Sequence, residues 1–226
     1  MERERFGTKE RALDDISRML ARYSGTKKER LLSKWLSQYT NFIKQEETFR
    51  PQFLKRYKRG EIIMANLGYR LGSEEGGPHY AIVLDKQNSE YSDIITILPM
   101  TSKKPTSRPN KYTLDLGSEI YDKLYAKYME KFHHSLKSID ISPKETPSGR
   151  TFTLSVSFDT TEADKVMDEI NSMKEGSIAL LSQITSISKM RIMKPKRTTD
   201  AFSGICLSSE SLDLIDASIK SLYLGS

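Results

Sequence analysis

The sequence predicts an α+β protein in which amphipathic helices decorate one small, strongly bent β-sheet. Three short runs rich in β-branched and aliphatic residues are typical of buried strands, and they cover residues 61–66, 80–84 and 94–98. Apolar residues at helical spacing occur both before and after these runs, which predicts helices on either side of the strands along the chain.

The first 52 residues predict a basic helical hairpin. Apolar residues recur at helix spacing up to residue 23, and Gly25 then breaks the pattern. Thr26 and Glu29 form a capping-box pattern that starts a second helix, and Pro51 prevents that helix from running on. Because two helices of this length need a partner for their apolar faces, we expect a role in interaction or dimerisation rather than in reading DNA.

The remaining residues, 53–226, predict a second domain that carries an elaboration at about residues 117–175. Within it we expect a helix over 118–136, a loop over 138–150 and another helix from Thr161. Between them, residues 151–158 alternate perfectly and predict a strand whose apolar side chains face inward: Phe152, Leu154, Val156 and Phe158. A final helix is expected over 209–224.

A glycine-rich loop separates the first two predicted strands. Residues 71–79 read LGSEEGGPH and hold three glycines and one proline. Glycine permits unusual backbone angles and lets a ligand come close, and loops on a rigid sheet often carry the chemistry. The loop is therefore the first candidate for a functional site.

The positive charge is concentrated near the N-terminus. The whole chain carries a net charge of +6, and residues 1–59 hold 16 Lys and Arg against 8 Asp and Glu. The junction at residues 54–60, LKRYKRG, fits either phosphate binding with stacking or a solvated linker. With one cysteine, Cys206, an internal disulfide is excluded, and no apolar run approaches a membrane span, so we expect a cytoplasmic protein.

Several of these segments resemble the MazF/PemK (Kid) family of toxin ribonucleases. The sequence RGEI, then LGSEEGG, then AIVLD and a strand ending in Thr101 and Ser102 follow the order and spacing of that family. Later, GSIALLSQITSISKMRI at residues 176–192 is similar to the family's next strand and turn. The resemblance covers about residues 58–116 and 176–224.

The resemblance implies an SH3-like small β-barrel with a C-terminal helix, which forms a homodimer and binds an antitoxin protein across its RNA groove. It implies an endoribonuclease that cleaves single-stranded RNA by attack of the substrate's own 2′-hydroxyl, with no metal and no cofactor. Membrane binding is not expected, and DNA is expected only through an antitoxin. His133 and His134 do not suggest a metal site, because neighbouring helical residues point about 100° apart.

The resemblance also implies the site residues. His79 occupies the position of the family's catalytic arginine, and Thr101 occupies that of the second catalytic residue. Histidine can give or take a proton, whereas arginine is a permanent cation that binds phosphate with paired hydrogen bonds. The residues implied to bind substrate are Arg70, Ser73, Gly76, Gly77 and Ser102.

Two other interpretations stay open. Because His79 replaces arginine, the chain can instead be a catalytically silent binding protein that holds RNA, an antitoxin or another partner. The resemblance can also concern the fold alone, with the helical hairpin serving as an interaction module. Growth arrest and RNA fragmentation on expression would distinguish the ribonuclease from both.

Overall fold

The computed structural model describes residues 8–108 and 110–225, which divide into two compact units. One unit contains the N-terminal helices together with Leu67–Gly77, and the other contains Arg50–Asn66 and the chain from Pro78 onward. Within the described residues, no helix combines the length and apolar character needed to cross a membrane. The predicted division at residues 52 and 53 stays a prediction.

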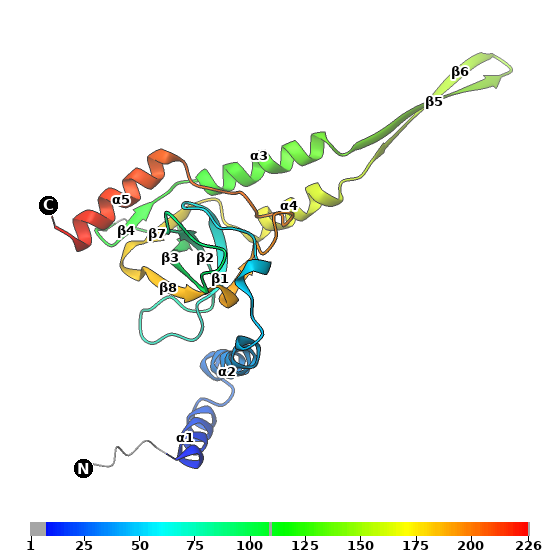
Figure 1. Ribbon diagram of the computed structural model, residues 1–226. Coiled ribbons are helices and arrows are strands. Elements are labelled where there is room, and N and C mark those ends of the chain that lie inside the picture. Colours follow the sequence, from blue (N-terminus) through cyan, green and yellow to red (C-terminus); the bar gives the residue numbers. More distant parts are fainter. Residues whose placement is uncertain (1–7, 109, 226) are drawn as a thin grey trace, which may run out of the picture. The chain divides into compact units, whose positions relative to one another are not determined.

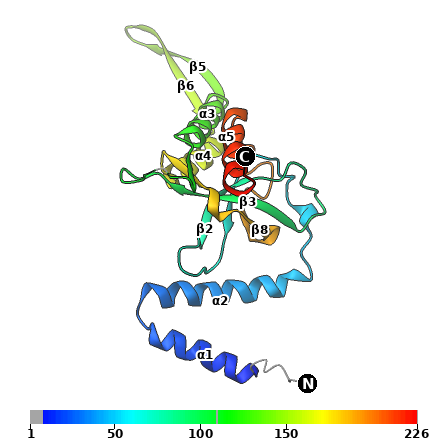
Figure 2. The ribbon, with the colours of Figure 1, turned by 90° about the vertical axis from the view of Figure 1, so that its left-hand side faces the viewer.

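The first unit contains the two predicted helices, α1 (Lys9–Arg22) and α2 (Lys27–Glu46), which fold back on one another (Figure 2). The predicted capping box at the start of α2 is confirmed, because the Glu29 amide donates to the Thr26 hydroxyl at 3.3 Å. The Glu29 carboxylate in turn accepts from the Gly25 amide at 2.7 Å. No residue of α1 is buried, and Leu32 is the buried residue of α2.

The second unit is built on an antiparallel sheet whose strands run in the order β4-β7-β3-β2-β1-β9, with β8 also paired to β3 (Figure 1). These strands are β1 (Ile62–Asn66), β2 (Pro78–Val83), β3 (Ile94–Ser102), β4 (Thr113–Asp115), β7 (Ser177–Leu180), β8 (Thr185–Ser188) and β9 (Ile192–Lys194). The three strands predicted from composition are confirmed as β1, β2 and β3. The long strand β3 changes partner along its length, because Ile94–Ile97 pair with β8 whereas Met100–Ser102 pair with β7.

Three helices supply apolar residues to the core of this unit. They are α3 (Glu119–His133), α4 (Thr161–Ser172) and α5 (Ser209–Tyr223), as the sequence predicted. Short 3₁₀ turns complete the unit at Pro51–Phe53, Leu181–Gln183 and Lys189–Arg191. The core joins sheet residues to helix residues, among them Ile62, Ile82, Leu98, Leu124, Val166 and Ile215.

Between α3 and α4 the chain forms a two-stranded antiparallel hairpin, β5 (Leu136–Thr146) and β6 (Gly149–Phe158). The expectation of a loop over residues 138–150 was therefore wrong for most of that segment, which is strand apart from the turn at Pro147 and Ser148. The strand expected over 151–158 is confirmed as β6. Its apolar side chains do not face inward, however, because every residue of β6 is exposed.

The basic junction is not a solvated linker throughout: two of its cations, Arg56 and Lys58, are exposed, and the other two form ion pairs within the unit. Lys55 forms an ion pair with Glu61, and their side chains are only 7% and 2% exposed. Tyr57 is buried, its hydroxyl donates to the Pro195 carbonyl at 2.8 Å, and burial raises its pKa. Arg59 pairs with Asp216 of α5. Two of the four cations in the predicted phosphate-binding cluster, Lys55 and Arg59, thus form ion pairs that stabilise their own unit.

Candidate functional site

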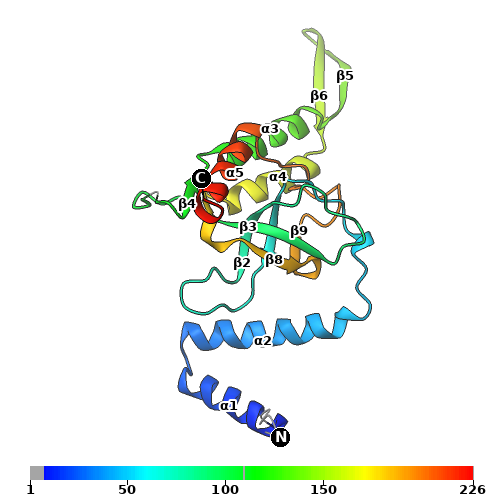
Figure 3. The same cartoon turned by 60° about the vertical axis from the view of Figure 1, so that its left-hand side comes forward.

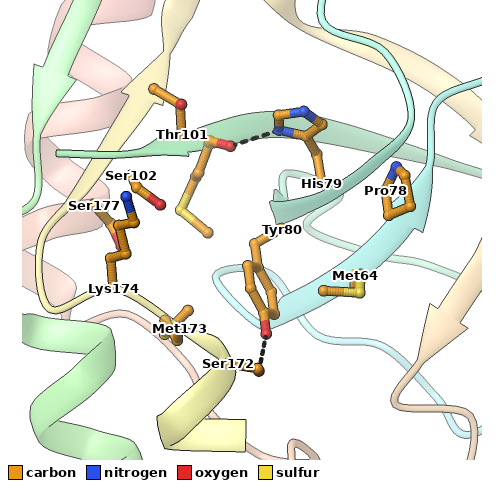
Figure 4. A pocket seen from close by; sticks show the side chains of 11 residues that line it. Met64, Pro78, His79, Tyr80, Thr101, Ser102, Ser172, Met173, Lys174 and Ser177 are labelled. Carbon is orange, nitrogen blue, oxygen red and sulfur yellow. Dashed lines mark hydrogen bonds between the residues drawn. The ribbon is translucent and has the colours of Figure 1, made fainter. Parts of the chain in front are cut away.

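The start of β2 and the end of β3 line a pocket of about 270 Å³. The two strands are antiparallel neighbours, with Ala81 opposite Pro99, so the first residues of β2 lie beside the last residues of β3. His79, Thr101 and Ser102 therefore line the same pocket (Figure 4). The structure thus brings together three of the residues that the resemblance implied.

His79 is half-buried in β2, where it lies opposite Ala65 of β1. Its Nδ1 atom lies 3.1 Å from the carbonyl oxygen of Met100. Because a carbonyl oxygen only accepts hydrogen bonds, this contact assigns the hydrogen of the neutral ring to Nδ1 and the lone pair to Nε2. In the neutral ring, this hydrogen bond to the Met100 carbonyl therefore selects the tautomer whose Nε2 can accept a proton.

Thr101 and Ser102 are held by ladder pairing on the other edge of β3. Thr101 lies opposite Ile178 and Ser102 lies opposite Ser177, both on β7. Both residues are half-buried and line the pocket. A hydroxyl in this position can donate to a phosphate oxygen, and the rigid ladder reduces the entropy lost in ordering it.

The opposite wall comes from the end of α4 and the turn that follows it: Ser172, Met173 and Lys174. Tyr80 joins this wall to the sheet, since its hydroxyl lies 3.4 Å from the Ser172 hydroxyl (Figure 4). The Tyr80 ring also stacks on Phe202 with ring centroids 5.2 Å apart. Sequence analysis did not identify these wall residues, because the elaboration falls between the two segments that carry the resemblance.

Lys174 is the cation of this pocket. It is exposed, and in Figure 4 its side chain points toward the Ser102 side of the pocket. The described residues give Lys174 no hydrogen bond and no ion pair. Lys103, next to Ser102, differs: it pairs with Asp115 at 2.5 Å, and this hydrogen bond is the main cause that lowers the pKa of the Asp115 carboxyl.

Gly176 allows the turn that carries Lys174 to approach β3 closely. The Lys103 amide donates to the Gly176 carbonyl at 2.8 Å, which extends the pairing between β3 and β7. A Cβ atom on Gly176 would lie only 2.8 Å from the Cβ of Lys103. The position of Lys174 therefore depends on a glycine two residues further along the chain.

The remaining predicted residues, Arg70, Ser73, Gly76 and Gly77, belong to the unit with the N-terminal helices. Gly77 has a left-handed φ of +78° and its amide donates to the Gly68 carbonyl at 2.7 Å. Arg70 donates through Nε to the Leu67 carbonyl at 3.0 Å, and its guanidinium lies 3.6 Å from the Glu74 carboxylate. Their predicted role in substrate binding stays a prediction.

The fold and pocket describe an α+β protein with a pocket of mixed polar and apolar lining at the ends of two neighbouring strands. Residues 58–131 match the family described as PemK-like, MazF-like toxin of type II toxin-antitoxin system. This match confirms, for residues 58–131, the MazF/PemK resemblance found in the sequence, and members of that toxin family generally are endoribonucleases that pair with antitoxins. No curated protein matches the chain.

The matched segment includes His79, Thr101 and Ser102 but ends within α3. The wall residues Ser172 to Lys174 and the β7 partner Ser177 lie outside it. The later resemblance at residues 176–224 therefore stays a prediction. The described part of the chain brings no three His, Cys, Asp or Glu side chains together in an arrangement that could hold a metal ion.

Proposed function

We propose that this chain is an endoribonuclease toxin of a type II toxin-antitoxin module, which cleaves single-stranded RNA by attack of the substrate's own 2′-hydroxyl. The observation that carries the proposal is the shared pocket of His79, Thr101 and Ser102, which come from two strands of the segment that matches the toxin family. A reaction of this kind needs no protein nucleophile, only positioning, proton transfer and stabilisation of phosphate charge.

In the proposed reaction, His79 Nε2 accepts the proton of the 2′-hydroxyl. The O2′–P bond forms while the P–O5′ bond breaks, and the departing 5′ oxygen takes a proton from water. The products are a 2′,3′-cyclic phosphate and a 5′-hydroxyl. The Thr101 hydroxyl donates to a non-bridging phosphate oxygen, with Ser102 as a second donor of the same kind.

Lys174 supplies the permanent positive charge that the family obtains from its arginine. None of the described residues that line the pocket is an arginine, and His79 stands at the position where one is expected. Lys174 lines the same pocket. An ammonium group stabilises phosphate charge as a point charge, without the paired hydrogen bonds of a guanidinium.

Four substitutions at three residues test this assignment with purified protein and a fluorescent single-stranded RNA in chelator. We expect His79→Ala to reduce cleavage by about 10² to 10⁴-fold, the usual contribution of a general acid or base. We expect smaller losses for Thr101→Val and Lys174→Met, and partial retention for Lys174→Arg. Exposed residues elsewhere provide matched controls in His134→Ala and Lys144→Met, which should cleave at the wild-type rate.

If His79→Ala and Thr101→Val cleave RNA at the wild-type rate, this pocket is not the catalytic site. Cleavage that is lost in those variants but unchanged in Lys174→Met would reject Lys174 alone. These outcomes separate the failure of the function from the failure of one residue's role.

The alternative function, a catalytically silent binding protein, rests on the absence of an arginine among the described pocket residues. It predicts that wild-type protein binds single-stranded RNA or an antitoxin without cutting RNA. His79→Arg then becomes informative, because a gain of cleavage would identify a degenerate site. A loss of cleavage on the same substitution supports the histidine-based reaction.

We also infer an antitoxin partner, a homodimer and a cytoplasmic location from the family. The partner change of β3 from β8 to β7 supports a strongly bent sheet, and we propose that it belongs to a small SH3-like barrel. Co-expression of a small neighbouring reading frame that relieves growth arrest would support the antitoxin.

A further inference from the structure

The β5–β6 hairpin carries an unpartnered apolar face. Every residue of β6 is exposed, as is every residue of β5 except Thr146. Figures 1 and 3 show the hairpin extending from the ends of α3 and α4, away from the sheet of its own unit. An isolated two-stranded hairpin is at best marginally stable in water, so a segment of this length needs additional packing.

The cross-strand register gathers the apolar residues on one face. Apolar residues lie opposite one another in the pairs Leu136 with Phe158, Ile139 with Val156, Ile141 with Leu154 and Pro143 with Phe152. A register shift between Leu136 and Ser138 adds one residue to β5, which brings Leu136 onto the same face as Ile139. The intervening pairs hold the polar residues of the other face, including Ser142 with Thr153 and Ser138 with Ser157.

The apolar face is as large as one side of a stable protein interface. Its side chains are between 42% and 66% exposed: Leu136, Ile139, Ile141, Phe152, Leu154, Val156 and Phe158. Together they present roughly 800 Å², which is about what each partner contributes to an interface of standard size. Contiguous exposed apolar surface of this extent marks an interaction site.

The charges of the hairpin argue against a nucleic acid on this face. Residues 136–158 contain three basic and two acidic residues, a net charge of +1. Binding of RNA through its phosphates requires clustered cations, which this hairpin lacks. The surface is instead suited to an apolar protein partner.

Pro143 also disfavours pairing along the edge of β5. A proline has no backbone donor, and it is tolerated in a strand where its nitrogen faces away from the partner strand. The outer edge of β5 therefore lacks one donor that an added strand would need. Packing through the apolar face would cover these exposed apolar side chains directly.

We propose that this face packs against the same face of a second copy of the chain. Two copies related by a two-fold axis place apolar pairs on apolar pairs, with the tip of each hairpin over the base of the other. The tip carries the Glu145–Arg150 ion pair at 3.3 Å, and the base carries the Lys137–Asp159 ion pair at 2.9 Å. Each end thus offers one positive and one negative group, so neither meets uncompensated like charge.

The mass of the full-length protein in solution tests the proposal. We expect the double substitution Ile141→Lys with Leu154→Lys to lower the mass measured by sedimentation velocity, because two lysines would bury unpaired charge in the apolar contact. The control Ser142→Lys with Thr153→Lys adds the same charge to the neighbouring pair on the polar face, and its mass should equal that of the wild type. An unchanged mass in the Ile141 and Leu154 variant overturns the proposal.

A cysteine variant provides a second measurement that does not depend on charge. In a Cys206→Ser background, Leu154→Cys should form a disulfide-linked dimer under mild oxidation, whereas Ser155→Cys on the opposite face should not. Equal crosslinking of both variants, or of neither, contradicts the face-to-face arrangement. Loss of RNA binding in the lysine variant, with its mass unchanged, would instead assign the face to RNA.

Discussion

The two β regions of the second unit show how similar strand patterns reach opposite environments. In the central sheet, Ile82 of β2 lies opposite Ile62 and Leu98 and is fully buried. In the hairpin, Ile141 lies opposite Leu154 and remains 65% exposed. The difference is that the sheet is covered by α3, α4 and α5, whereas the hairpin has only its own two strands. A strand pattern thus specifies a face, and the rest of the fold decides whether that face is buried.

The largest expected difference between the regions concerns their ion pairs. Replacing Glu61 with alanine leaves the buried Lys55 ammonium without its carboxylate and removes an acceptor of the Gly204 amide. We expect the free energy of unfolding to fall by about 3–5 kcal/mol, because an unpaired buried charge is strongly unfavourable. Glu145→Ala, which breaks an exposed pair of the hairpin, should cost about 0–1 kcal/mol. Urea unfolding of both variants measures the contrast, and equal costs would contradict it.

The matching contrast for apolar residues is somewhat smaller. Ile82→Ala removes a side chain from a packed core and should cost about 2–5 kcal/mol. Ile141→Ala should change the free energy of unfolding by less than about 0.5 kcal/mol at protein concentrations too dilute for association. A comparable loss in both variants would mean that the hairpin is packed within the single chain.

The sequence predicted the elements of the fold better than their surroundings. The strands β1, β2 and β3, the capping box at Thr26 and the helices α3, α4 and α5 all follow local patterns that act over a few residues. The strand β5 was missed because two prolines and a glycine are typical of loops. In the structure Pro143 lies within β5, opposite Phe152 of β6, and Pro147 lies in the turn between the two strands.

Residues of the candidate site could be predicted from the sequence only where they belong to the family motif. His79 and Thr101 were predicted through their resemblance to a family pattern, and antiparallel pairing of β2 and β3 explains why they line one pocket. Lys174 had no such signal, since a single lysine after a helix is ordinary in a sequence. Its place in the pocket depends on pairing between β3 and β7, which joins residues far apart along the chain. The buried Lys55 was misread for the same reason, because its partner became visible only in three dimensions.

A substitution at the junction between the elaboration and the sheet is expected to have a smaller effect on the free energy of unfolding. Gly176→Ala places a Cβ atom 2.8 Å from that of Lys103, so we expect a loss of about 1–3 kcal/mol in stability together with lower cleavage. Adding Lys103→Gly should restore part of both, as a double-mutant cycle would measure. The absence of any coupling between the two positions would show that this close approach does not position Lys174.

The smallest expected effect is a change of stability with pH in the acidic range. The side-chain hydrogen bond from Lys137, followed by that from Thr161, lowers the pKa of Asp159 at the base of the hairpin below its ordinary value of 3.8. Because the folded-state pKa is the lower one, the stabilisation is present above 3.8 and is lost as the pH falls through the folded-state pKa. The difference in urea unfolding between wild type and Asp159→Asn should therefore be greatest near neutral pH and shrink in acid. A difference that grows in acid would reverse this assignment.

The most direct measurement of the central claim uses one change in the substrate. Purified wild-type protein is incubated in chelator with a single-stranded RNA, and the cut position is mapped. The same RNA is then made with a single 2′-deoxy nucleotide on the 5′ side of that position. Cleavage of the first RNA to a 2′,3′-cyclic phosphate and none of the second is the predicted result. Equal cleavage of both, or no cleavage of either, would contradict the proposed reaction of His79 and Thr101.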